Sequence, residues 1–332
     1  MNETSIPLLL PLMQLAAGLV VLLWGAERLV TGAASLARGF GISPLVVGMT
    51  IIGFGTSAPE LVISVAAAWR GNPALAAGNA IGSNLANIGL VLAIATLLRP
   101  ITIDSSILRR EAPVLLAVTV LAAAMLADFD LTRPEGIVLG ALLLVFLTWA
   151  ARLGRTRQMR TDPLGRELQH ELPAARSQRW AILWILVGLA ALPISSVVMV
   201  EGAVASARLL DVPEEFIGLT LVAIGTSLPE LAAALASSLK KEGGLTLGNI
   251  IGSNLFNLLG VLGIAASIRP LTVVAAFFYR DVMMMVALTV LMTLLYFWPG
   301  RRRVLNQGGG ILLLVSYLFY LSLLLGALGA ER

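Results

Sequence analysis

The 332-residue sequence contains no cysteine and a single histidine, His170. The absence of cysteine excludes disulfides, thiolate metal centres and cysteine nucleophiles. Because zinc and copper sites in proteins recruit histidine or cysteine, the composition also argues against a transition-metal centre. We expect His170, which lies in a charged segment, to be a solvated loop residue.

Charge is also scarce. Charged residues make up 13% of the chain, hydrophobic residues make up 58%, and the mean hydropathy is +0.91. Such a chain cannot hide its apolar surface in a soluble core, so its solvent must be lipid. In a soluble protein the net charge of +4 would suggest nucleic acid. Here we attribute it to basic residues gathered on one membrane face, and we expect neither a nucleic-acid partner nor an obligatory protein partner.

Apolar runs recur along the whole sequence, and about 20 residues suffice to span the hydrocarbon of a bilayer. The runs predict an all-α polytopic membrane protein with ten transmembrane helices, at 7–37, 44–69, 73–98, 112–127, 136–151, 180–207, 216–239, 246–268, 282–298 and 309–328.

The chain contains an internal duplication. The stretch G-T-S-A-P-E at 55–60 returns as G-T-S-L-P-E at 225–230, and segments 48–100 and 218–270 share 24 identities in 53 positions. We therefore predict a first five-helix repeat at 1–151, a basic hinge loop at 152–179 and a second five-helix repeat at 180–332. Because five is odd, the second repeat should enter the membrane in the opposite orientation, as an inverted-topology repeat. The two motifs would then face each other at mid-depth.

Basic residues indicate the orientation. Loops on one predicted side of the membrane, with Arg28 at a helix end, hold 17 of the 23 lysines and arginines. That side is predicted to be cytoplasmic, which places the hinge loop inside the cell and both termini outside it. The first helix is not preceded by a basic region, so we expect it to be retained rather than cleaved. The predicted location is the cell (inner) membrane.

Each copy of the repeated motif carries a glutamate inside an apolar run, Glu60 in the first and Glu230 in the second. A carboxylate near the bilayer centre costs at least about 3 kcal/mol, so each needs a partner or a cation. The basic residues Arg70 and Lys240 follow about ten residues later and belong at the membrane surface. A mobile cation is the simplest counter-charge.

Hydroxyls and a proline surround each carboxylate. Thr56 and Ser57 precede Glu60 by four and three residues, which puts them on nearly one helix face. Pro59 lacks the N–H that would bond to the Gly55 carbonyl, so we expect the helix to open there and free carbonyls around 53–56. The second repeat carries the equivalent residues Thr226, Ser227, Pro229 and Glu230.

Neutral oxygens are added by the next helix of each repeat. Ser83 and Asn87, like Ser253 and Asn257, are spaced by four residues. The sequence thus predicts an all-oxygen cage with two carboxylates, two amides and several hydroxyls. Hard cations such as Ca²⁺ and Na⁺ prefer such a site, whereas Mg²⁺ gives up its waters reluctantly and fits less well.

The paired G-T-S-x-P-E and G-N-x-I-G-S-N-x-x-N segments resemble the α-repeats of the cation/Ca²⁺ exchanger superfamily, in its prokaryotic Na⁺/Ca²⁺ exchanger branch. The resemblance covers both repeats and essentially the whole chain. It implies a ten-helix antiporter that exchanges Na⁺ for Ca²⁺ by alternating access. In it helices 2, 3, 7 and 8 form the ion site and helices 1 and 6 slide across them.

The resemblance also implies ligands. Glu60 and Glu230 would be shared by both ions, the Thr56 and Thr226 backbones would serve Ca²⁺, and Asn87 and Asn257 would lie centrally. The flanking Na⁺ positions would be formed by Ser57, Ser83, Ser227 and Ser253 with the carbonyls of Gly53 and Ala223. Many relatives carry Asp where this chain has Asn257. The amide removes a possible third carboxylate and argues against K⁺ dependence.

Two other functions could be built on the same residues. A Ca²⁺/H⁺ antiporter would use the same carboxylates, and a Na⁺ gradient at fixed pH would distinguish it. An intramembrane hydrolase at Ser57 or Ser227 is disfavoured, because no histidine or lysine lies within reach in sequence and no G-x-S-x-G motif occurs. We expect no enzyme activity and no cofactor beyond the transported ions. The remaining acidic residues, such as Glu27, Glu111 and Asp281, are expected at helix ends as interfacial charges.

Overall fold

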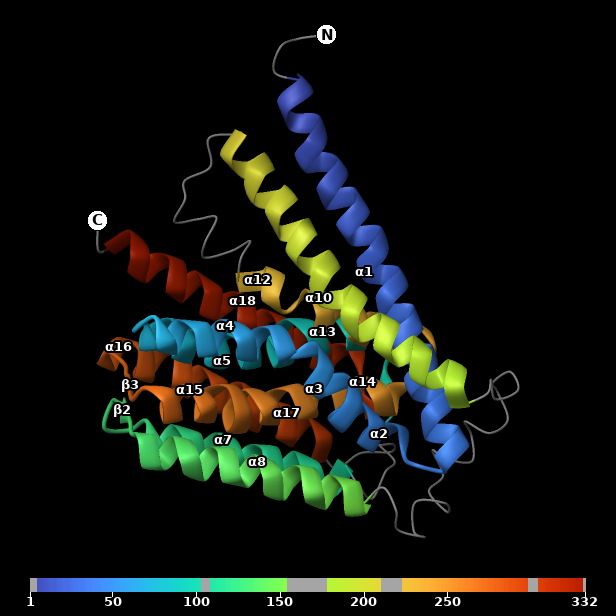
Figure 1. The fold of residues 1–332 in the computed structure, drawn as a ribbon. Helices are drawn as coiled ribbons and strands as arrows, with labels where there is room; N and C mark the ends of the chain where they lie inside the picture. The colour runs from blue at the N-terminus through green and yellow to red at the C-terminus, as the bar shows by residue number, and fades with distance from the viewer. Residues whose placement is uncertain (1–4, 103–107, 154–177, 210–222, 298–303, 331–332) are drawn as a thin grey trace.

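The computed structural model describes residues 5–102, 108–153, 178–209, 223–297 and 304–330, and these are almost entirely helical (Figure 1). Most of the predicted hinge loop, with His170, lies outside the described residues, as does the start of the predicted helix at 216–239.

Two long helices, α1 (Ser5–Phe40) and α10 (Gln178–Leu209), lie side by side at an angle to the other helices (Figure 1). Glycines allow their backbones to approach closely. A Cβ added to Gly32 would lie 2.6 Å from the Ala181 carbonyl oxygen of α10, and one added to Gly202 would lie 2.6 Å from the Pro11 carbonyl oxygen of α1. Each helix packs more extensively on the other than on any other element, so we call them the α1–α10 pair.

The rest of the first half consists of short helices that follow one another almost without loops. The elements are α2 (Pro44–Val47), η1 (Gly48–Ile52), α3 (Gly53–Thr56), α4 (Ala58–Trp69), α5 (Pro73–Ala86), η2 (Asn87–Leu92), α6 (Ala93–Leu98), β1 (Ile101–Thr102), α7 (Leu108–Met125), β2 (Asp130–Leu131) and α8 (Arg133–Leu153). The η elements are π-helical turns, which often occur at functional sites.

The second half repeats this order after α10. Its elements are α12 (Ala223–Thr226), α13 (Leu228–Leu239), α14 (Gly243–Phe256), η5 (Asn257–Leu262), α15 (Gly263–Ile268), β3 (Leu271–Thr272), α16 (Ala275–Phe277), η6 (Phe278–Val282), α17 (Met283–Phe297), β4 (Val304–Leu305) and α18 (Gln307–Ala330).

The local backbone repeats with the 170-residue offset. Ser57 has a φ of −86° and a ψ of 5°, and Ser227 has nearly the same values, −90° and 5°. The π-helical turns η2 and η5 begin at equivalent asparagines. Gly71 has a φ of +80°, and its counterpart Lys241 has the left-handed value of +62° although it is not glycine. The duplicated sequence therefore folds into duplicated local structure.

Short antiparallel strands connect the two halves. Strand β1 pairs with β4 through Ile101 and Leu305, and β2 pairs with β3 through Leu131 and Leu271. Each two-stranded sheet thus joins a loop of one repeat to a loop of the other.

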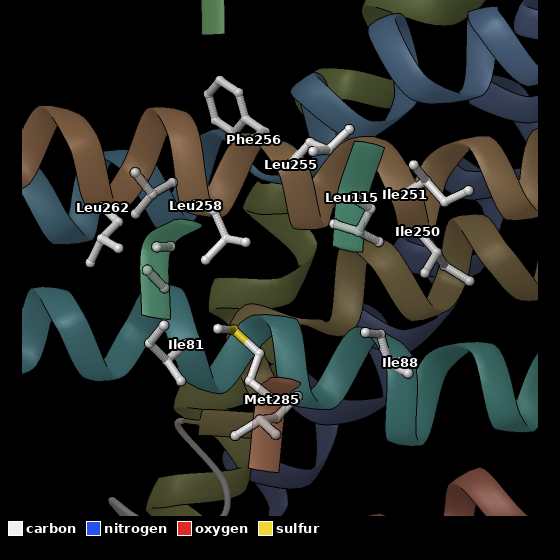
Figure 2. Packing of buried hydrophobic residues seen from close by; sticks show 14 of the residues in the cluster. Ile81, Ile88, Leu115, Ile250, Ile251, Leu255, Phe256, Leu258, Leu262 and Met285 are labelled. Carbon is white, nitrogen blue, oxygen red and sulfur yellow. The ribbon is translucent and has the colours of Figure 1, made fainter. Parts of the chain in front are cut away.

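The centre of the fold is formed by the segments 74–98 and 243–268, which are the most buried of the apolar helices. Figure 2 shows Ile81 and Ile88 of the first half pointing toward Ile250 and Leu258 of the second. Helices α7 and α8 cover one side of this centre (Figure 1). Packing of the equivalent helices against each other brings the two copies of the motif together.

Among the described residues, seven helices are long and apolar enough to cross a membrane, or eight if the pair 44–56 and 58–69 forms one span bent by 43°. Two shorter apolar helices, Glu111–Met125 and Leu228–Leu239, fall below that length. The all-helical, polytopic membrane architecture agrees with the sequence prediction, whereas length and composition do not establish the predicted count of ten.

Candidate functional site

The helix break predicted at each proline is present. Helix α3 ends at Thr56, Ser57 leaves the helical conformation, and α4 begins at Ala58 with Pro59 in its first turn. In the second half Ser227 separates α12 from α13 in the same way. A proline in the first turn of a helix is tolerated because its missing N–H would be unsatisfied there anyway.

Each break places a glutamate in the first turn of the helix that follows, Glu60 in α4 and Glu230 in α13. Both side chains are at most 1% exposed. Neither forms an ion pair within the described residues. The Ser57 hydroxyl donates to Oε1 of Glu230 over 3.0 Å. Oε2 of Glu230 and both carboxylate oxygens of Glu60 have no hydrogen-bond partner.

Contacts between hydroxyls and amides join the break of the first repeat to the second. The Thr56 hydroxyl lies 3.3 Å from Oδ1 of Asn249, to which it donates, and 3.4 Å from the Ser253 hydroxyl. Ser253 in turn donates to the Gly53 carbonyl oxygen over 3.2 Å. The two motifs, 170 residues apart, therefore form one polar site.

The Gly53 carbonyl is not free, contrary to the sequence expectation. It accepts the backbone N–H of Ser57 over 3.2 Å as well as the Ser253 hydroxyl. The physical reason is that a proline removes the donor for the residue four positions earlier. Pro59 therefore releases the carbonyl of Gly55, and Pro229 releases that of Gly225.

The predicted asparagine ligands follow α5 and α14 and are buried. Asn87 donates from Nδ2 to Oδ1 of Asn254 over 3.2 Å, and its own Oδ1 has no partner. Asn257 is fully buried, and neither atom of its amide has a partner. The Ser227 hydroxyl is likewise buried without a partner, and Ser83 is buried in α5.

Ten of the twelve predicted ligand residues are buried. The exceptions are Thr226, which is partly buried, and Ala223, whose side chain is not described. Asn79 and Asn249 are not among the predicted ligands, although both lie in the repeated motif. Asn79 donates to the backbone carbonyl of Glu60 over 3.0 Å, and Asn249 to that of Glu230 over 3.5 Å. These amides hold the turns that carry the carboxylates.

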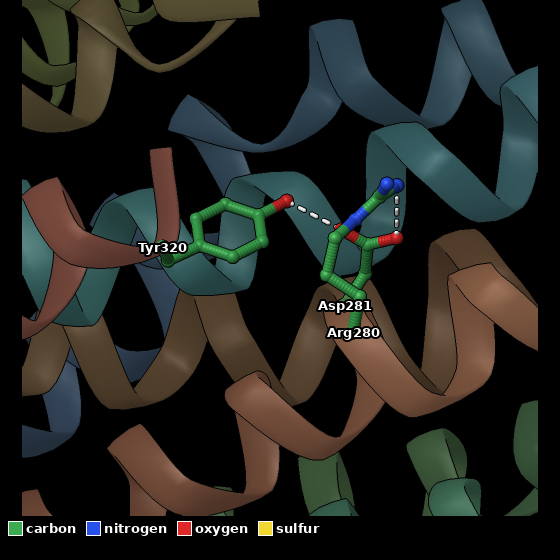
Figure 3. Close-up of polar contacts among 3 residues, drawn as sticks. All are labelled: Arg280, Asp281 and Tyr320. Atoms are coloured by element: carbon green, nitrogen blue, oxygen red, sulfur yellow. Dashed lines mark hydrogen bonds and ion pairs between the residues drawn. The ribbon is translucent and has the colours of Figure 1, made fainter. Parts of the chain in front are cut away.

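Asp281, which the sequence predicts to be an interfacial charge at a helix end, is buried against other helices, and only 3% of its surface is exposed. The Arg280 guanidinium donates to the Asp281 carboxylate over 2.8 Å, and the Tyr320 hydroxyl donates to it over 2.7 Å. Because Tyr320 belongs to α18, this helix covers Asp281 (Figure 3). Glu111 is also buried. Glu27 is half exposed and pairs with Lys240 over 3.3 Å, but it lies within α1 rather than at its end.

Several buried polar oxygens of the predicted ligand residues have no hydrogen-bond partner. Unpartnered buried oxygens come from both glutamates, Ser227, Asn87 and Asn257. Leaving each such atom unsatisfied costs about 1–3 kcal/mol, and more when it is charged, so the site suits a cation. Nowhere in the described part of the chain do three acidic or histidine side chains converge. Two carboxylates and neutral oxygens therefore make the site, as suits a hard cation.

Comparisons with known proteins agree with this geometry. The family model described as "Sodium/calcium exchanger protein" matches residues 10–152 and 180–326. The inner membrane protein YrbG of Escherichia coli is 42% identical over 268 residues, which are 80% of this chain and 82% of that protein. The sodium/calcium exchanger MaX1 of Methanosarcina acetivorans is 28% identical over 295 residues, covering 78% and 83% of the two chains.

A solved structure of the sodium-calcium exchanger NCX_Mj, soaked with Na⁺ and Sr²⁺, superimposes with a TM-score of 0.83 at 30% identity. The match covers 95% of this chain and 98% of that one. The resemblance drawn from the repeated motifs is thereby confirmed: the chain is a multi-pass membrane protein that belongs to the sodium/calcium exchanger protein family.

Proposed function

We propose that this member of a family of cation antiporters exchanges Na⁺ for Ca²⁺ across the membrane by alternating access at the buried site. The observation that carries the proposal is the pair Glu60 and Glu230, whose buried carboxylates come from two repeats and leave three oxygens without a protein partner. Because no basic side chain among the described residues neutralises them, cations supply the counter-charge.

The charge of the site suggests the coupling. Two ionised glutamates carry −2, which one Ca²⁺ or two Na⁺ neutralise. A third Na⁺ would leave the site at +1 and make exchange electrogenic. An empty site exposes its two charges to an apolar surrounding when it closes, and this desolvation is costly. The protein therefore changes between its two access states mainly when an ion is bound, which couples the movement of one ion to that of the other.

The proposed ligands are those that the family resemblance implies. Glu60 and Glu230 are shared by both ions, and the Thr56 and Thr226 backbones serve Ca²⁺. Asn87 and Asn257 complete the centre. The remaining ligands are Ser57, Ser83, Ser227 and Ser253, with the carbonyl of Ala223. Gly53 can join them only when the Ser253 hydroxyl releases its carbonyl.

The proposed topology has ten spans in two inverted five-helix repeats, 1–151 and 180–332. Contacts between loops support it, because a ten-span chain puts both strands of each β pair on one face of the membrane. The Ser238 hydroxyl, at the end of the seventh predicted span, donates to the Ala95 carbonyl near the end of the third, over 3.0 Å. The Arg133 side chain, which follows the fourth predicted span, donates to the Ile268 carbonyl at the end of the eighth predicted span over 3.2 Å.

In this topology the loop at 152–179 is a cytoplasmic hinge, both termini are extracytoplasmic, and the protein resides in the inner membrane. The similarity to YrbG, which is named as an inner membrane protein, supports that membrane. The α1–α10 pair corresponds to the helices expected to slide across the ion site.

A Ca²⁺/H⁺ antiporter is the second candidate, since two protons would also neutralise the carboxylates. Uptake of ⁴⁵Ca into proteoliposomes distinguishes the two. We expect an outward Na⁺ gradient at equal pH to drive accumulation of Ca²⁺, and an H⁺ or K⁺ gradient without Na⁺ to leave it near the background. Accumulation driven by the pH gradient alone would favour the second candidate.

A further inference from the structure

A serine outside the ion site reaches the break of the second repeat. The hydroxyl of Ser196, in α10, donates to the carbonyl oxygen of Gly225 over 2.6 Å. Gly225 is the residue whose carbonyl loses its helical partner because Pro229 has no N–H. Ser196 is buried, so no solvent competes for this bond. The hydroxyl replaces the missing backbone donor.

One face of α10 touches both breaks. Leu189 packs against Gly55 and Val200 against Gly225, in contacts so close that a Cβ on either glycine would overlap these side chains. Ser196 lies seven residues after Leu189 and four before Val200, which places all three on the same face of the helix.

Only the second break receives a hydroxyl by this route. The residue of α1 that lies 170 positions before Ser196 is Ala26, which is buried and has no polar atom on its side chain. The two halves of the fold therefore differ at this point.

The Ser196 bond also crosses a boundary in the fold. The α1–α10 pair is held together by close glycine contacts and meets the remaining helices less extensively. A displacement of the pair along the breaks would separate Ser196 from Gly225. The freed carbonyl would then need another partner, because an unsatisfied backbone group at membrane depth is costly.

We propose that Ser196 is a positioning residue that holds the α1–α10 pair on the second break and thereby sets the balance between the two access states. The inference rests on the proposed alternating-access exchange. A net hydrogen bond shifts an equilibrium roughly 2- to 12-fold. Ser196→Ala should shift the population away from the bonded state by this factor.

The chain offers a matched control in the adjacent serine. Ser195 is also buried in α10, but its hydroxyl donates within its own helix, to the carbonyls of Ala191 over 2.6 Å and Leu192 over 3.1 Å. Ser195→Ala removes the same atom from the same helix without touching the break.

The first experiment measures the populations directly. Spin labels are attached at Leu186→Cys in α10 and Leu98→Cys in α6, which are both exposed. The natural sequence contains no cysteine, so only these two positions would be labelled. We expect Ser196→Ala to change the ratio of the inter-label distance populations by roughly 2- to 12-fold, and Ser195→Ala to leave it within about 1.5-fold. Equal ratios in both variants would overturn the inference, whether or not the protein exchanges Na⁺.

The second experiment separates a shifted balance from a damaged site. An apparent dissociation constant rises as the competent state becomes rarer. Right-side-out and inside-out membrane vesicles offer Ca²⁺ to one face at a time. In Ser196→Ala the apparent KM for Ca²⁺ should rise at one face and fall at the other. A change in the same direction at both faces, or at neither, would contradict the proposal. If the parent protein itself does not exchange Na⁺ for Ca²⁺, the proposed function is refuted instead.

Discussion

Removing one carboxylate should convert the site from one that suits Ca²⁺ to one that does not. In Glu60→Gln the site keeps its shape but carries −1, so a bound Ca²⁺ leaves a net charge of +1. Glu60 is fully buried and its two carboxylate oxygens have no protein partner. An uncompensated charge at such depth costs about 2.5–3.5 kcal/mol on insertion scales. Since 1.4 kcal/mol is a factor of ten, the affinity for Ca²⁺ should fall roughly 100-fold or more.

Thermal unfolding in detergent measures this loss without relying on transport. A ligand at 100 times its dissociation constant stabilises the folded state by about 2.7 kcal/mol, and after a 100-fold loss of affinity by only about 0.4 kcal/mol. In chelator, Glu60→Gln should be at least as stable as the parent, because the empty site holds one charge fewer. Glu135→Gln, which removes a charge at the N-terminus of α8, is the control and should keep the full response to Ca²⁺.

Two results would refute this reasoning. A full stabilisation of Glu60→Gln by Ca²⁺ would show that Glu60 is not a ligand. A lower stability in chelator would show that the carboxylate contributes to the fold rather than to the ion site.

Three further changes test separate parts of the structure. Asn257→Asp adds a third charge to the site, so ⁴⁵Ca flux should become more dependent on pH or K⁺; an unchanged dependence in a folded, active variant would remove Asn257 from the site. Tyr320→Phe deletes the donor to Asp281, which should lower the free energy of unfolding by about 1–3 kcal/mol in thermal scans while Ca²⁺ binding is kept; no loss would contradict a role for this bond. Lys241→Gly, which restores the residue type of its counterpart Gly71 at a left-handed position, should raise the free energy of unfolding by up to about 1 kcal/mol, and a decrease would argue against strain there.

The sequence predicted the two helix breaks and the meeting of the two motifs because its signals are local and occur twice. The motif around Glu60 specifies a proline break, hydroxyls and a carboxylate within six residues, and its second copy specifies the same for Glu230. The duplication itself implied that the two would meet. Contacts such as that between Ser57 and Glu230 could be anticipated only as an approximate proximity.

Other features depend on packing between distant segments and carry no local signal. Asp281 reads as a charge at a helix end, but Tyr320 of another helix covers it. The Gly53 carbonyl was expected to be free along with its neighbours, but Pro59 removes the hydrogen-bond donor of the Gly55 carbonyl alone. The contact of Ser196 with Gly225 depends on where α10 crosses the break, and neither residue's neighbours in sequence indicate it.

Equilibrium binding of ⁴⁵Ca to the purified protein, in competition with Na⁺, tests the central claim most directly. A site with two carboxylates should bind one Ca²⁺ per chain. Na⁺ should displace it with a Hill coefficient above one, since at least two Na⁺ replace one Ca²⁺, and this should happen at constant pH. If Na⁺ fails to displace Ca²⁺ and only protons do so, the buried site does not exchange Na⁺ for Ca²⁺.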